Sequence, residues 1–101
     1  MKISTVILNK IWDILVSQAG AIERERNDFI NYFLEEGSVK EYRFRGKLGF
    51  GGKIKRNSWD IFICFYSEDH TEERSAIKEK VNFLIKEILS KESLDGRAEQ
   101  V

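Results

Sequence analysis

The residues best suited to catalysis are a single cysteine, a single histidine and a short run of carboxylates. A nucleophile such as Cys64 needs an adjacent base, for which His70 is the only histidine, and a third group to orient that base. Cys64 lies within the most apolar segment of the chain, where burial disfavours the reactive thiolate. We therefore interpret Cys64 as a core residue and His70 as a loop residue, and we predict no catalytic residue and no enzymatic activity.

The carboxylates gather just after that apolar segment, at Glu68, Asp69, Glu72 and Glu73. Paired carboxylates can bind Mg²⁺ or Ca²⁺, or act as general acid and base. Their spacing is not that of an EF-hand, whereas Asp69 followed by Glu72 is typical of a helix N-terminus. We predict no metal and no cofactor. One alternative is a small metal-dependent nuclease or hydrolase that uses Glu68, Asp69 and His70.

A glycine-rich segment between residues 46 and 53 resembles a phosphate-binding loop in composition only. That motif has a glycine, four intervening residues, a Gly-Lys pair and then a hydroxyl residue. Counting back from Gly52-Lys53 puts Lys47 in place of the first glycine, and Ile54 stands in place of the hydroxyl. We therefore interpret the glycines as the turn and bulge positions of a β-hairpin.

Positive charge is concentrated around these glycines. Residues 40–56 hold seven cations and one carboxylate, a net charge of +6 in a chain whose formal net charge is zero. Such a dipolar protein can offer a cationic surface to a partner without being basic overall. The predicted partner-binding residues are Arg43, Arg45, Lys47, Phe50, Lys53, Lys55 and Arg56.

Three interpretations of this basic hairpin stay open. Cations interleaved with aromatic residues suit nucleic-acid phosphates and stacked bases. They equally suit an acidic surface on a protein or ribonucleoprotein partner. The third interpretation is a solvated sheet face with no partner.

Hydrophobic periodicity indicates the elements that must position the hairpin. Helical spacing is found in two N-terminal segments and one C-terminal segment, and strand-like patterns lie between them. The predicted helices are 3–16, 21–36 and about 71–90, and the predicted strands are 42–45, 53–55 and 60–66. The resulting order, α-α-β-β-β-α, defines an α+β domain with a three-stranded antiparallel sheet.

The strand at 60–66 is apolar on both faces, so we expect it to be central and covered by helices. A chain of 101 residues suits one domain, here 1–90, followed by a flexible tail at 91–101. The apolar stripe on 3–16, with Trp12, could serve a homodimer instead of a core. One cysteine excludes an internal disulfide, and no apolar run reaches membrane-spanning length, which favours a cytoplasmic protein.

Two segments resemble a pattern found in small uncharacterised bacterial and phage proteins. The first is Tyr42-Arg43-Phe44, Gly46 and Leu48-Gly49-Phe50-Gly51-Gly52-Lys53, and the second is Cys64, Tyr66, Glu68-Asp69, Thr71 and Glu73-Arg74. The resemblance implies a mobile-element setting and carries over no catalytic residue. In that setting we expect a regulatory protein that occupies an anionic surface of a host defence machine, as an anti-CRISPR protein does.

Overall fold

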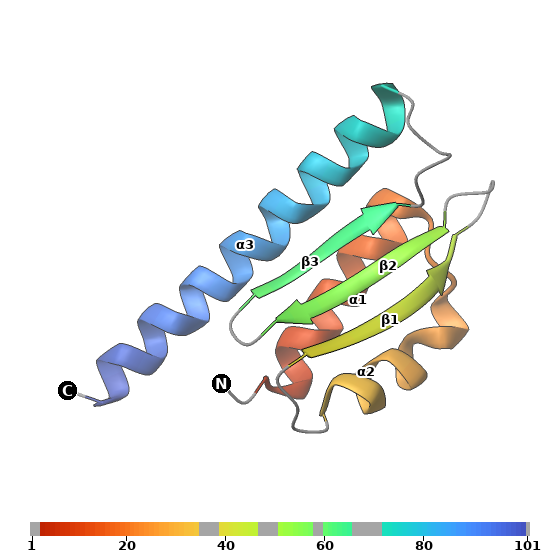
Figure 1. The fold of residues 1–101 in the computed structure, drawn as a ribbon. Coiled ribbons are helices and arrows are strands. Elements are labelled where there is room, and N and C mark those ends of the chain that lie inside the picture. The colour runs from red at the N-terminus through yellow and green to blue at the C-terminus, as the bar shows by residue number, and fades with distance from the viewer. Residues whose placement is uncertain (1–2, 35–38, 47–50, 58–59, 66–71, 101) are drawn as a thin grey trace.

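Helices stand before and after a three-stranded antiparallel sheet in the computed structural model, which describes residues 3–34, 39–46, 51–57, 60–65 and 72–100. The order is α1 (Thr5–Ala19), η1 (Glu23–Glu25), α2 (Arg26–Leu34), β1 (Val39–Arg45), β2 (Gly51–Asn57), β3 (Asp60–Phe65) and α3 (Glu72–Gln100) (Figure 1). The predicted α+β class and element order are confirmed. Each observed strand includes most or all of the corresponding predicted one.

Helix α1 supplies much of the apolar surface of the core. The Ser4 hydroxyl caps its N-terminus by accepting a hydrogen bond from the Ile7 N–H at 3.2 Å. Gly20 ends the helix in the left-handed conformation, with φ 67°, which glycine adopts without strain. The buried face between these ends comprises Ile7, Leu8, Ile11, Trp12, Leu15 and Ala19. The stripe that could have served a homodimer therefore forms part of the core.

Helix α2 is fixed to α1 through one arginine. The Arg26 guanidinium donates hydrogen bonds to Asp13 at 2.5 Å, to Glu23 at 2.5 and 2.6 Å, and to the Asn9 side chain at 3.0 Å. The hydrogen bond from Arg26 lowers the pKa of the Glu23 carboxyl below its ordinary value of 4.5. The network holds α2 so that Phe29, Ile30 and Phe33 enter the core beneath the sheet.

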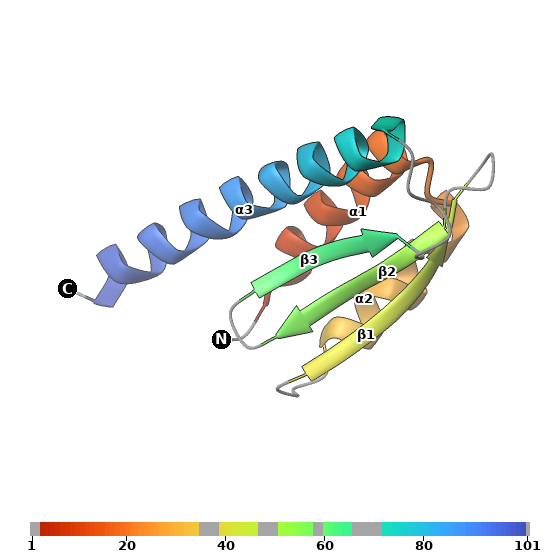
Figure 2. The ribbon, with the colours of Figure 1, turned by 45° about the horizontal axis from the view of Figure 1, so that its top comes forward.

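The sheet order is β1-β2-β3, so β2 and not β3 is the central strand. The expectation that residues 60–66 form a central strand covered on both faces is wrong. Ile61 and Ile63 are buried, but Phe62 points to the opposite face and is 37% exposed. Strand β3 is instead an edge strand, and α3 packs against it and runs alongside it (Figures 1 and 2).

Helix α3 packs along the edge of β3 that does not pair with β2. Its residues Val81 and Ile85 are fully buried. The Asn82 amide oxygen accepts a hydrogen bond from the Ile63 N–H at 2.7 Å, and the amide nitrogen donates to the Ile63 carbonyl at 3.2 Å. Asn82 thus hydrogen-bonds both backbone groups of Ile63, which at an uncovered edge would be free to pair with another strand.

The helix continues to Gln100, past the end predicted at residue 90, because the sequence there still contains strong helix formers despite losing its apolar period. No helix of the described residues is both long enough and apolar enough to cross a membrane.

Candidate functional site

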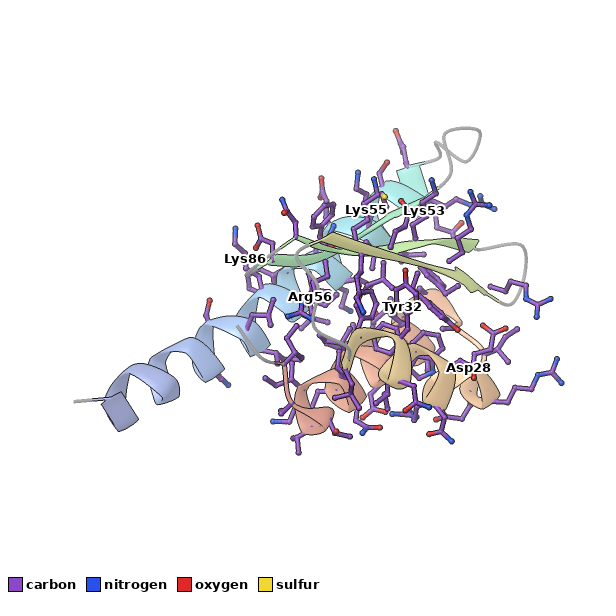
Figure 3. The ribbon with its side chains drawn as sticks, turned by 60° about the horizontal axis from the view of Figure 1, so that its bottom comes forward. Asp28, Tyr32, Lys53, Lys55, Arg56 and Lys86 are labelled. Atoms are coloured by element: carbon purple, nitrogen blue, oxygen red, sulfur yellow. The ribbon has the colours of Figure 1, made fainter. Side chains whose placement is uncertain are left out.

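The two faces of the sheet differ in what covers them. Helices α1 and α2 lie against one side, which we call the inner face, and we call the other side the outer face. Figure 3 shows Lys53 and Lys55 projecting from the outer face, whereas Arg56 and Tyr32 lie between the sheet and the helices. Because side chains alternate between the two faces along a strand, the position of each described residue in its strand decides which face it lies on.

Strand pairing brings three of the predicted cations together on the outer face. Arg43 stands directly opposite Lys53 across β1 and β2, and Glu41 stands opposite Lys55. Glu41 forms ion pairs with both Lys53 and Lys55, each at 3.7 Å, so one carboxylate is shared by two ammonium groups. Among the described residues, Arg43 has no ion pair. Directly opposed like charges destabilise a sheet. Here Arg43 is exposed, whereas the Lys53 side chain is only 27% exposed.

Arg45 lies at the rim of this cluster. Its guanidinium donates to the Glu25 carboxylate at 3.2 and 3.3 Å, which brings it round the edge of β1 toward the helical side. The Arg45 side chain is nevertheless 78% exposed, whereas Glu25 is largely covered. A surface ion pair of this kind contributes about 0–1 kcal/mol, so an anionic partner can compete for the arginine.

Arg56 does not belong to the surface, which corrects its place in the predicted site. It is only 5% exposed, and its guanidinium donates to the Phe33 carbonyl at 3.1 Å. Its cross-strand neighbour Lys40 donates to the Tyr32 carbonyl at 3.0 Å. Both cations therefore satisfy carbonyls of the last turn of α2, where the helix dipole favours positive charge.

Two other predicted partner-binding residues, Lys47 and Phe50, lie outside the described residues. The same holds for Glu68, Asp69 and His70, on which the nuclease alternative depends. Glu72 and Glu73 are exposed in the first turn of α3, as expected of residues at a helix start. The described residues contain no group of three or more histidine, cysteine or acidic side chains placed to hold a metal.

Sequence reasoning missed two outer-face residues. Phe62 stands opposite Lys55 and Cys64 stands opposite Lys53, so both border the cationic cluster. Cys64 is half-buried there and is not the core residue that we expected. The signal was available, because Phe62 and Cys64 alternate with Ile61 and Ile63 and must point the other way.

Gly52 has a packing role on the inner face. A Cβ at this position would lie 2.7 Å from the Cys64 carbonyl oxygen and 3.1 Å from the ring of Phe44, its cross-strand neighbour. Contacts under 3.0 Å with backbone atoms cannot be accommodated without a shift. Glycine is therefore required here mainly by the close approach of the Cys64 carbonyl, and the Phe44 ring packs tightly against the same position. This reason is separate from the turn geometry that the sequence indicated.

Comparison of the chain with protein-family models, with curated proteins and with solved structures finds no match. The resemblance to small bacterial and phage proteins therefore stays a prediction. Function has to be inferred from the outer face itself.

Proposed function

We propose that this is a non-catalytic binding protein whose outer sheet face holds an anionic partner. The observation that supports the proposal is the placement of Arg43, Lys53 and Lys55 side by side on a face that α1 and α2 do not cover. The rim arginine, Arg45, extends the same positive surface. Such a cluster attracts a negatively charged partner and orients it during association.

The internal pairing of the cluster favours a binding role over a merely solvated face. The repulsion between Arg43 and Lys53, which lie opposite each other, lowers the stability of the sheet. Glu41 offsets this repulsion only through two long ion pairs, with Lys53 and with Lys55. By contrast, Arg26 on the helical side makes contacts of 2.5 Å with its carboxylates. A partner that supplies negative charge would relieve the repulsion that the chain itself leaves in place.

The resemblance noted in the sequence supplies a setting for this activity. A regulatory protein that inhibits a host defence machine, in the manner of an anti-CRISPR protein, would act by occupying an anionic surface. Such a protein needs a cationic face and no active site. The partner would be an acidic protein, a ribonucleoprotein or a nucleic acid.

A paired substitution tests the proposal. The variant Lys53→Gln with Lys55→Gln removes two outer-face charges, and the control Lys10→Gln with Arg24→Gln removes two exposed charges from the helical layer. Retention on immobilised heparin, read as the salt concentration that elutes the protein, should fall for the first variant and stay near wild type for the second. Equal elution of the two variants would remove the outer face from consideration. Circular dichroism melts confirm that both variants fold.

The same proteins serve as baits in host lysate, with and without nuclease treatment. A partner held by the outer face is captured by the wild type and the control but lost from the Lys53→Gln, Lys55→Gln variant. Loss after nuclease treatment assigns it to nucleic acid, and persistence assigns it to protein. Cleavage of an oligonucleotide in the presence of Mg²⁺ would instead support the nuclease alternative.

A further inference from the structure

An exposed aromatic ring adjoins the cationic cluster. Phe62 is 37% exposed on the outer face and stands directly opposite Lys55 on β2. Facing residues on adjacent antiparallel strands have Cβ atoms about 5 Å apart, so the ring and the ammonium group reach the same small area. A partner at this place meets an apolar π-face and positive charge together.

A nucleotide carries both complementary groups. Its base stacks on an aromatic ring, and its phosphate pairs with Lys or Arg. Because base and phosphate are joined through one sugar, a ring and a cation on neighbouring strands can contact a single nucleotide. An acidic protein surface supplies the charge but not the stacking face.

The ring also distinguishes single strands from duplexes. A base within a duplex is already stacked on its neighbours, whereas an unpaired base can lie flat on an exposed aromatic side chain. Lys55 adjoins the ring on β2 and has Glu41 opposite it on β1, whereas the neighbouring row carries Lys53 on β2 and Arg43 on β1. A strand that crosses the sheet from β3 to β1 would therefore place a base on Phe62 and its phosphates over the cations.

We infer that the outer face binds single-stranded nucleic acid, with Phe62 stacking on a base and Arg43, Lys53 and Lys55 contacting phosphates. The inference rests on the proposed function and narrows its partner to one chemical class. The binding is sequence-tolerant, because every base offers a π-face and every phosphate the same charge.

Fluorescence anisotropy with a labelled oligo-dT of about 12 nucleotides, within the range of sheet-based single-strand binders, tests the inference. Phe62→Leu keeps an apolar side chain but removes the ring, and should raise Kd about tenfold. Phe83→Leu is the matched control, since Phe83 is 60% exposed but belongs to α3 and not to the sheet, and should leave Kd unchanged. Thermal melts of both variants verify folding.

Salt dependence tests the phosphate contacts separately. The slope of log Kd against log salt should become shallower by about 1.4 in the Lys53→Gln, Lys55→Gln variant, because two single-strand phosphate contacts are lost. The slope should be unchanged in Phe62→Leu, whose side chain carries no charge.

Two further probes, a duplex of the same length and a polyglutamate peptide, separate this inference from the proposed function. Tighter binding of oligo-dT than of either probe, together with weaker binding by Phe62→Leu, supports it. Equal or tighter binding of a probe, or wild-type affinity in Phe62→Leu, overturns it. The proposed function survives that result if Lys53→Gln, Lys55→Gln weakens binding of the preferred probe. If the double variant changes the binding of no probe, both fail.

Discussion

The inner and outer faces of the sheet are built from the same residue types and use them oppositely. Phe44 and Arg56 on the inner face are 1% and 5% exposed, whereas Phe62 and Arg43 on the outer face are open to solvent. The inner pair contributes to stability through burial and a hydrogen bond to α2. The outer pair is exposed, so its charge and its ring are available to a partner.

The difference shows that residue composition alone does not define a binding surface. Residues 40–56 contain seven cations, yet Lys40 and Arg56 serve the C-terminal turn of α2. Cations on the inner face have structural roles, whereas cations on the outer face are available to a partner. The alternation of side chains along each strand determines which face a cation lies on. Substitutions on the two faces should therefore differ in their effect on stability.

The largest difference should lie between the two phenylalanines. Phe44→Ala removes a fully buried ring and should lower the free energy of unfolding by about 3–5 kcal/mol. Phe62→Ala removes a ring that is already partly in water, and should cost less than about 1.5 kcal/mol. Urea unfolding followed by circular dichroism measures both. Similar losses would show that the outer ring is part of the core.

The two arginines should differ next. Arg56→Met leaves the Phe33 carbonyl without this charged donor and should cost about 2–3 kcal/mol. Arg43→Met should change stability by no more than about 0.5 kcal/mol, with stabilisation favoured because the charge opposite Lys53 is removed. The same urea titration applies. A large cost at Arg43 would indicate a structural role that contradicts its assignment to the outer face.

The edge of β3 offers a smaller effect. Asn82→Ala leaves the Ile63 N–H and carbonyl without their side-chain partner, and should cost about 1–2 kcal/mol after the better helix propensity of alanine is counted. Lys86→Ala, at an exposed position one turn further along α3, is the control and should be near neutral. Light scattering provides a second measurement, because an uncapped edge promotes association between copies. Unchanged stability in Asn82→Ala would mean that water replaces the amide without cost.

The smallest effect concerns pH. Burial on the inner side of β1 raises the pKa of Tyr42 above its ordinary value of 10.0, with Glu25 and Asp28 acting in the same direction. The folded state then holds the phenolic proton more tightly than the unfolded state, so stability is lost as pH rises through the folded pKa. Above pH 10 the wild type should lose stability more steeply than Tyr42→Phe in parallel thermal melts. An identical loss of stability above pH 10 in the wild type and in Tyr42→Phe would contradict the raised pKa of Tyr42.

The fold was largely predictable because hydrophobic periodicity determines which elements form. The stripe of α1 and the apolar run of β3 both appear in the sequence as patterns of the correct period. Strand order was not predictable from that run, since an edge strand alongside a helix can be as apolar as a central strand. The continuation of α3 to Gln100 depends on helix-forming residues without an apolar period, so hydrophobic periodicity did not indicate it.

The candidate site was predicted in part. Arg43, Lys53 and Lys55 lie together as expected, but Arg56 shares the parity of Ile54 and so faces the core. Applying strand alternation to each cation would have excluded it. No local signal marked Asn82, because its partner is a backbone group on another element.

The absent side chain at Gly52 also determines how the cations line up. Sliding β1 along β2 by two residues would keep every side chain on its present face, so hydrophobic patterning alone does not forbid it. That slip would set the Phe44 ring against Ile54 instead of against the space at Gly52, and would move Arg43 from Lys53 to Lys55. The missing side chain on the inner face thereby determines which cations lie opposite one another on the outer face.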